Sequence, residues 1–383
     1  MDLFFHSPGS DLVKISKVKT ESASSIILSQ KENDDECLGF LKLFGKSFSL
    51  FPEKYSSMQR TLGITEKELI HAMPPQTVRG HFQEITEAVQ NVLCCKENEE
   101  YLVSYLEIKR FLRELSPPII DIKKLQEVID STEHAATKQR IMELMPGKDG
   151  KARKTEYGML GSRTGRLVVT SGPQVLTLPS AARKSFKSRY ANGKVIQIDL
   201  ISAEPKIALH MVGDSSVIDV YDHLSNRILE GKVSRDQAKL ITLCALYGQS
   251  EANLKKTLPS TMNPRSVIRE TKQFFNVYEL EKVLKSMQSS GGLRNVLGRP
   301  IKLPDKDQRL LISYFLQSSA AEISILAFSE WYKENYHQAV PLYIIHDAII
   351  VDCTEELSKR LLDQKVITLK IGSWNFDAKA SSF

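Results

Sequence analysis

Two short stretches decide the fold: Val195–Glu204, which reads VIQIDLISAE, and Leu342–Cys353, which reads LYIIHDAIIVDC. In the first, aliphatic residues precede Asp199 and predict a strand that ends near a carboxylate. In the second, a β-rich run is interrupted by the polar pair His346-Asp347, which predicts a hairpin with that pair in its turn. We expect the rest of the chain to be arranged around these strands.

The two aspartates, Asp199 and Asp347, are embedded in apolar sequence. A carboxylate in such a setting must be paired or metal-bound, because burying an isolated charge is very costly. Two carboxylates brought together repel unless cations neutralise them, and this arrangement can hold two Mg²⁺ ions about 3.5–4 Å apart for in-line phosphoryl transfer. The alternative for either residue alone is a role in a turn or a helix cap.

A third stretch, Arg235–Gly248 (RDQAKLITLCALYG), predicts a helix with functional groups on one face. Arg235, Lys239, Leu243 and Tyr247 recur every four residues, so they lie within about 120° of the helix circumference. Two cations one turn apart suit a polyphosphate, and the apolar surface beyond them suits a nucleobase. The alternative is a surface helix with two solvated cations.

Charge is concentrated in one part of the 383-residue chain, whose formal net charge is +6. Between Lys148 and Lys194 the sequence holds eleven basic residues and two acids, which gives this segment a charge of +9. A basic segment in a nearly neutral body is typical of a protein that binds a polyanion such as nucleic acid. The alternative is a solvated basic loop.

Other features exclude several classes of protein. No uninterrupted apolar run approaches the roughly 18 residues needed to cross a bilayer, so we expect no membrane span. Residues 1–17 do not resemble a secretory signal. The five cysteines are scattered without a CxxC pair, which argues against a disulfide scaffold or a structural zinc site and favours a reducing, cytoplasmic location (Cys37, Cys94, Cys95, Cys244 and Cys353).

Taken in order, the segments from about Tyr157 to the C-terminus resemble the polymerase module of family A DNA polymerases, the group of bacterial DNA polymerase I and certain phage replicases. Five blocks carry the resemblance: Thr164–Leu167 with Leu176–Pro179, Asp199–Glu204, Arg235–Gly248, Gly298-Arg299 with Gln317–Ile323, and His346-Asp347. The resemblance implies an α+β, right-hand polymerase fold with an antiparallel palm sheet and helical fingers and thumb. It implies an N-terminal extension (1–45), a thumb (46–150), fingers (216–290) and a palm in two parts (151–215 and 291–383).

The implied activity is template-directed DNA synthesis, in which dNTPs are added to a primer 3′-OH with the help of two Mg²⁺ ions, for which Mn²⁺ can substitute. The resemblance assigns metal binding to Asp199 and Asp347, and assistance of the leaving group to Lys239. It assigns nucleotide binding to Arg235, Lys239, Tyr247, Glu204, Leu243 and His223, with Glu204 excluding a 2′-OH. It assigns DNA contacts to Arg166, Thr164, Gln317, Arg309, His346 and Arg299.

The sequence departs from the family pattern at two informative positions. Ala348 replaces the acid that usually follows the second aspartate, and Leu243 replaces an aromatic residue on the predicted helix. The first departure removes a secondary carboxylate from the metal site. The second alters base stacking and discrimination between sugars.

We expect no proofreading exonuclease in this chain. Its one Asp-x-Glu motif, Asp34-Asp35-Glu36, lies in a polar run that we interpret as a solvated loop. The expected partners are primer-template DNA and dNTPs, and a separate exonuclease, helicase or clamp is a further possible partner. We expect the protein to be a monomer, located in the host cytoplasm if it comes from a phage. Two rival functions stay open: a single-subunit RNA polymerase, and a catalytically inactive DNA-binding accessory protein with the same fold.

Overall fold

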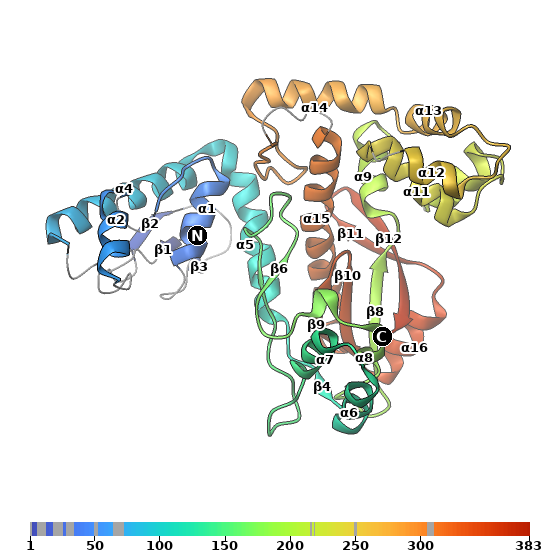
Figure 1. Cartoon of the computed structure of the whole chain (residues 1–383), viewed down its shortest axis with the longest axis horizontal. Helices are drawn as coiled ribbons and strands as arrows, with labels where there is room; N and C mark the ends of the chain where they lie inside the picture. The colour runs from blue at the N-terminus through green and yellow to red at the C-terminus, as the bar shows by residue number, and fades with distance from the viewer. Residues whose placement is uncertain are drawn as a thin grey trace. The chain divides into compact units, whose positions relative to one another are not determined.

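The computed structural model describes residues 2–5, 13–17, 26–27, 34–49, 53–63, 73–214, 217, 219–248, 251–304 and 310–383. The chain divides into two compact units (Figure 1). Unit 1 comprises Met1–Leu106 and Gly298–Pro300, and unit 2 comprises Glu107–Leu297 and Ile301–Phe383. These units are defined by compactness, so they do not test the predicted division into thumb, palm and fingers.

Unit 1 combines a small sheet with helices. Its elements are β1 (Asp2–Phe5), β2 (Val13–Lys17), β3 (Ile26–Ile27), α1 (Asp34–Leu43), α2 (Glu53–Leu62), α4 (Pro75–Cys94) and the short 3-10 helix η1 (Lys96–Asn98). The strands lie in the order β2-β1-β3. The interpretation of Asp34-Asp35-Glu36 as a loop is wrong, because these residues form the first turn of α1.

Helix α5 (Glu99–Glu114) begins in unit 1 and ends in unit 2. The three- and four-residue spacing of apolar residues between Tyr101 and Leu115 predicts such a helix. In unit 1 the rings of Tyr101 and Tyr105 are buried, and the guanidinium of Arg299 donates a 2.9 Å hydrogen bond to the hydroxyl of Tyr101. Pro117 and Pro118 follow α5 and prevent its continuation, because proline lacks the required N–H.

The centre of unit 2 is a five-stranded sheet with the order β11-β12-β8-β10-β9. Its strands are β8 (Lys194–Leu200), β9 (Ala339–Ile345), β10 (Ala348–Cys353), β11 (Ile367–Ile371) and β12 (Trp374–Ser382), and every neighbouring pair is antiparallel. The predicted strand and the predicted hairpin are both confirmed. Strand β8 lies in the middle of the sheet, between the hairpin strand β10 and the C-terminal strand β12.

Two helices pack on this sheet. Helix α15 (Leu311–Asn335) contacts β9 and β11, and α16 (Glu355–Asp363) contacts β8, β10 and β12. By length and composition α15 could cross a bilayer, but 83% of its most apolar 18-residue window is buried inside the protein. This is the pattern of a core helix.

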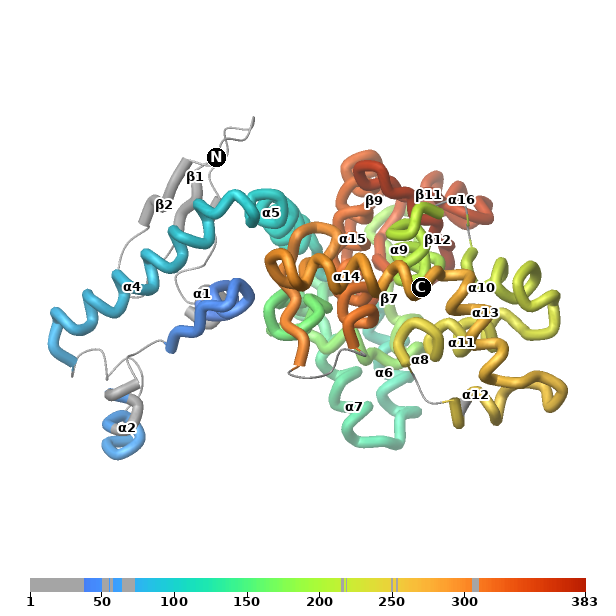
Figure 2. The backbone as a smooth tube through the Cα atoms, turned by 90° about the horizontal axis from the view of Figure 1, so that it is seen from above, coloured from blue at the N-terminus to red at the C-terminus, as the bar shows by residue number. Residues whose placement is uncertain are grey.

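A second group of helices lies beside α9 (Ala203–Met211), as Figures 1 and 2 both show. It comprises α10 (Val220–His223), the π-helical turn η3 (Leu224–Ile228), α11 (Arg235–Tyr247), α12 (Glu251–Thr257), α13 (Pro264–Phe274) and α14 (Val277–Gly291). Helix α11 buries Ala238, Ile241 and Ala245, which are three and four residues apart, against this group and its surroundings. Its face with Arg235 and Lys239 is therefore left for the site.

The segment between α5 and β8 forms a smaller layer. It contains β4 (Ile119–Ile120), α6 (Ile122–Ser131), α7 (Ala135–Met142), β5 (Glu156–Gly158), β6 (Val168–Ser171), η2 (Val175–Thr177), α8 (Ser180–Arg183) and β7 (Phe186–Lys187). The apolar pattern from Ile122 to Met145 predicts one helix ending before Pro146-Gly147, and this prediction is wrong, because the structure forms two helices there. The hydroxyls of Ser131 and Thr132 both donate hydrogen bonds to the backbone carbonyl of Val128, at 3.1 and 2.6 Å. These side chains compete with the backbone for that carbonyl, and α6 ends there before α7 begins.

Candidate active site

A cavity of about 490 Å³ lies in unit 2 where the sheet, α9, α11 and α15 come together. Its wall contains many of the polar residues that the sequence singled out: Arg166, Asp199, Glu204, Arg235, Lys239, Gln317, His346 and Asp347. Leu243 and Tyr221 add apolar surface. Segments from residue 166 to residue 347 therefore contribute to one concave site.

The two aspartates reach this cavity from neighbouring strands. Asp199 lies opposite Ala348 in the β8–β10 ladder, and the backbone N–H of Leu200 donates a 3.1 Å hydrogen bond to the carbonyl of Asp347. Strict alternation would place Asp347 and Ala348 on opposite faces of the sheet. His346 adopts a left-handed φ of 55° in the hairpin turn, which interrupts the alternation, and Asp347 lines the same cavity as Asp199.

The expectation that both aspartates are enclosed by apolar residues holds for only one of them. Asp199 is half-buried, whereas Asp347 is exposed because the two-residue turn carries it beyond the end of the strands. Burial and the nearby charge of Asp347 raise the pKa of Asp199 from 3.8 to about 6, although Lys239 and Gln197 act in the opposite direction. Negative charge at this spot is therefore only partly compensated by the protein.

Helix α11 supplies the cations. Its first turn is fixed by a capping box, in which Ser234 and Gln237 bond to each other's backbone N–H groups. Arg235, Lys239 and Leu243 follow at four-residue spacing and all line the cavity. Three of the four residues predicted to share one helix face thus line the cavity, and the fourth, Tyr247, reaches it only through its hydrogen bond to Glu204.

Glu204, in the first turn of α9, is held by two other predicted residues. The guanidinium of Arg166 donates a 2.8 Å hydrogen bond to Glu204 Oε1, and the hydroxyl of Tyr247 donates to Glu204 Oε2. Burial and the charge of Glu204 raise the pKa of Tyr247. Two distant segments of the chain thus fix the position of the Glu204 carboxylate at the cavity wall.

The far wall comes from α15 and the hairpin turn. Gln317 lines the cavity together with Ala320, Ala321 and Ser324, which lie on the same face of α15. His346 joins them from the turn. The small residues of α15 leave room in front of Gln317.

Four predicted residues do not line the cavity: Tyr247, His223, Thr164 and Arg299. His223 does not belong to the cavity wall, and its ring stacks on Phe274 with centroids 5.5 Å apart. Thr164 is 8% exposed and Arg299 is 1% exposed, and the DNA contacts assigned to these two side chains stay predictions. Arg309 lies outside the described residues.

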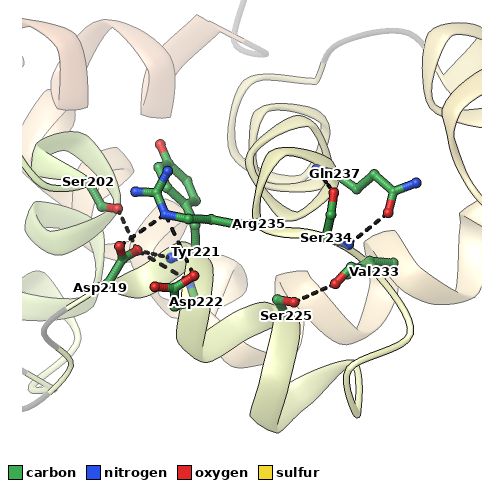
Figure 3. A network of polar contacts seen from close by, with 9 residues as sticks. All are labelled: Ser202, Asp219, Tyr221, Asp222, Ser225, Val233, Ser234, Arg235 and Gln237. Atoms are coloured by element: carbon green, nitrogen blue, oxygen red, sulfur yellow. Dashed lines mark hydrogen bonds and ion pairs between the residues drawn. The ribbon is translucent and has the colours of Figure 1, made fainter.

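Sequence reasoning missed three residues of the site. Tyr221 occupies the wall where His223 was expected, and its ring lies under the guanidinium of Arg235, 5.3 Å from it. Ser202 and Asp219 form a polar network with Arg235 (Figure 3). The available signal was the position of Asp219, an acid immediately before a helix, which is a typical N-cap.

The donor set fits magnesium. Two carboxylates, Asp199 and Asp347, share a concave site, and the raised pKa of Asp199 indicates charge that a cation would compensate. Among the described residues no group of three or more His, Cys, Asp and Glu gathers as a metal site. Mg²⁺ binds proteins through one or two carboxylates and takes its other ligands from water and substrate phosphates, so Asp199 and Asp347 are the residues that would hold it.

Comparison with known proteins identifies the class. The family model for DNA polymerase family A matches residues 109–371, well over half of the chain, and the protein belongs to that family. The fold is accordingly an α+β polymerase fold, as predicted. No match was found among curated proteins.

One solved structure that the chain is similar to is the POL domain of Pol1 from M. smegmatis in complex with DNA primer-template and dNTP. The two share 17% sequence identity with a TM-score of 0.45, over 85% of this chain and 59% of that one. The chain therefore spans about three-fifths of the length of that relative.

Proposed function

We propose that this protein is a template-directed DNA polymerase that adds dNTPs to a primer 3′-OH. The observation that carries the proposal is the cavity in which Asp199 and Asp347 meet Arg235 and Lys239 of α11. Two adjoining carboxylates and two cations are the groups that phosphoryl transfer from a triphosphate needs. Membership of DNA polymerase family A supports the same conclusion.

In this proposal each residue has a defined task. Arg235 and Lys239 bind the triphosphate, and Lys239 supports charge on the departing pyrophosphate. Glu204, whose carboxylate is held by Arg166 and Tyr247, has the task of excluding a ribose 2′-OH. Gln317 and His346 orient the primer end, and Leu243 and Tyr221 offer apolar surface to the nucleotide.

Asp199 and Asp347 would hold the magnesium ions. When bound, two such ions supply activation of the attacking hydroxyl and stabilisation of charge on the transferring phosphoryl group. The residues around them hold the nucleotide in place and restrict water, which makes the transfer effectively unimolecular.

The remaining predictions belong to this proposal as well. They are the two-ion mechanism, the absence of an exonuclease site in this chain, the division into thumb, palm and fingers, and cooperation with a separate exonuclease, helicase or clamp. The position of the one Asp-x-Glu motif, Asp34-Asp35-Glu36, supports the predicted absence of an exonuclease site, since the motif lies on a helix instead of at the end of a strand.

Primer extension tests the proposal. The full chain is incubated with a labelled primer-template, Mg²⁺ and either dNTPs or rNTPs. We expect extension with dNTPs, and a loss of about 10³-fold or more in Asp199→Ala and Asp347→Ala, because each removes half of the carboxylate pair. Asp363→Asn, an exposed residue at the end of α16, is the control and should retain full activity.

Three results would contradict the proposal. Preferential use of rNTPs would favour the rival RNA polymerase. A wild-type protein that binds primer-template without extending it would favour the rival accessory protein. Unchanged activity in Asp199→Ala would remove the catalytic role of the carboxylate pair.

A further inference from the structure

Asp219 is the centre of a polar network beside the cavity (Figure 3). Its side chain is only 12% exposed. Oδ1 accepts hydrogen bonds from the backbone N–H groups of Tyr221 (3.1 Å) and Asp222 (3.2 Å), which caps α10. Oδ2 accepts a 3.0 Å hydrogen bond from Nε of Arg235.

Ser202 links this network to the strand that carries Asp199. It occupies the N-cap position of α9 with a left-handed φ of 54°, but its hydroxyl does not cap the helix. The hydroxyl instead donates to Asp219 Oδ1 at 3.5 Å. Asp219 therefore joins the starts of three helices, α9, α10 and α11.

Arg235 meets two carboxylates of different character. Asp219 is nearly enclosed, and its oxygen lies 3.0 Å from Nε. Asp222 is 50% exposed, and its oxygen lies 3.7 Å from the same nitrogen. The ring of Tyr221 supports the guanidinium from below, 5.3 Å from its carbon.

This arrangement separates a fixed contact from a replaceable one. A hydrogen bond to an enclosed carboxylate with several other partners persists, because breaking it would leave a buried charge incompletely satisfied. An exposed ion pair at 3.7 Å is weak and is easily exchanged for a stronger anion. The bond to Asp219 uses Nε, and the terminal nitrogens of a guanidinium are the fork that binds phosphate oxygens.

We propose that Asp219 is a positioning residue that aims Arg235 at the phosphates of the incoming nucleotide, and that Asp222 competes with those phosphates for the same guanidinium. The proposal rests on the proposed function. It predicts opposite effects for two carboxylates that lie three residues apart.

The test is steady-state primer extension with variants that remove one charge and little else. Asp219→Asn keeps the volume and an oxygen that can still cap α10. We expect its KM for dATP to rise about 10-fold with a smaller change in kcat, because a charge-assisted hydrogen bond is lost. In Asp222→Asn we expect KM to fall about 2–3-fold, since a weak competitor is removed.

Asp236→Asn is the matched control. Asp236 is the next residue after Arg235, is exposed and carries the same charge. Its KM for dATP should stay within a factor of two of the wild type. The proposal is overturned if Asp219→Asn and Asp236→Asn have the same KM, or if Asp222→Asn raises KM.

A double-mutant cycle separates positioning from a purely structural role. In an Arg235→Ala background, Asp219→Asn should have no further effect on KM, because the residue through which it acts is gone. Effects that multiply in the double variant would show that Asp219 acts independently of Arg235, which contradicts the proposal. Thermal unfolding of each variant reports any loss of the α10 cap separately.

Equilibrium binding of dATP in Mg²⁺, measured by calorimetry on the full chain, distinguishes failure of this inference from failure of the proposed function. If the wild type does not extend primers, the polymerase proposal fails. The inference is then decided by binding alone: weaker binding in Asp219→Asn and tighter binding in Asp222→Asn support it, and equal binding in all variants overturns it.

Discussion

At the scale of single residues, Asp199 is placed where its ionised form is unfavourable. Burial and the charge of Asp347 raise its pKa from 3.8 to about 6, so the folded protein holds the proton more tightly than the unfolded chain does. As pH rises from about 4 to 6, ionisation therefore removes stability from the folded state, and above pH 6 the loss is complete.

We expect Asp199→Asn to be more stable than the wild type at pH 7.5 by about 1–2 kcal/mol in EDTA, a range that allows for partial solvation of the group. The advantage should shrink towards pH 5. Chemical denaturation at both values measures it. A variant that is less stable than the wild type at pH 7.5, or an advantage that does not depend on pH, would contradict this account.

Glu204 is the residue on which the choice of sugar depends in our proposal. Arg166 and Tyr247 hold its carboxylate at the cavity wall. We expect Glu204→Ala to raise rNTP use relative to dNTP use about 10–100-fold, since removing a few atoms from a pocket changes discrimination by this order. Tyr247→Phe should have a smaller effect in the same direction.

Single-nucleotide insertion with paired dNTP and rNTP measures this ratio. Tyr278→Phe is the matched control, because Tyr278 is 79% exposed and does not line the cavity. If Glu204→Ala leaves the ratio unchanged, Glu204 does not exclude the 2′-OH.

The sequence allowed some of these residues to be predicted and not others. Asp199, Asp347 and the four-residue repeat on α11 stand out because polar groups interrupt an apolar pattern. Tyr221 and His223 are two residues apart on a four-residue helix, and periodicity cannot choose between them there. The left-handed turn at His346, which brings Asp347 to the same cavity as Asp199, is set by the hairpin and not by local propensity.

At the scale of elements, α9 is tied to the sheet by a buried ion pair. Lys206 on α9 donates to the carboxylate of Asp377 on β12, and the two side chains are 10% and 11% exposed. Thr368 of β11 also donates to Asp377, at 3.3 Å. This pair fixes the start of α9, and with it Glu204, against the sheet.

We expect Lys206→Met to reduce the free energy of unfolding by about 3 kcal/mol, because it leaves a buried carboxylate without its cation. The double variant Lys206→Met/Asp377→Leu should recover part of that loss. Urea denaturation measures both. Lys379→Met, an exposed residue on the same strand, is the control, and an equal loss in the two lysine variants would show that the pair contributes nothing.

Element types were easier to predict than element ends. The strands of the hairpin and the helix α11 follow from clear periodicity. The break between α6 and α7 was missed, because it depends on hydroxyl groups that compete for the backbone carbonyl of Val128. Such competition leaves little trace in an apolar pattern.

At the scale of the whole molecule, the basic segment Lys148–Lys194 is the part of the chain that we expect to bind DNA in the proposed function. Part of its charge is used internally: Arg189 pairs with Asp352 at 3.0 Å and Arg166 pairs with Glu204 at 2.8 Å. Other basic residues of this segment, including Lys184 and Lys187, are exposed. Only the exposed cations can release counterions from DNA.

We expect the affinity for primer-template to fall steeply with salt, with a slope of log K against log[salt] of about −4 to −5 if roughly five phosphates are contacted. Lys184→Gln/Lys187→Gln should reduce the slope by about 2. Fluorescence anisotropy between 50 and 300 mM KCl measures it. The control pair Lys359→Gln/Lys365→Gln should keep the wild-type slope, and an affinity that does not depend on salt would contradict the prediction.

The central position of β8 has a consequence for how the protein is made. Its two sheet neighbours, β10 and β12, both come from the last part of the chain, so a ribosome must synthesise residues 201 to 382 before both edges of β8 are covered. During that interval an aliphatic strand with two open edges is exposed to wrong partners. We expect nascent chains of this protein to depend on chaperones until β12 has been synthesised, and the carboxylate pair to come together only after β10 has joined β8.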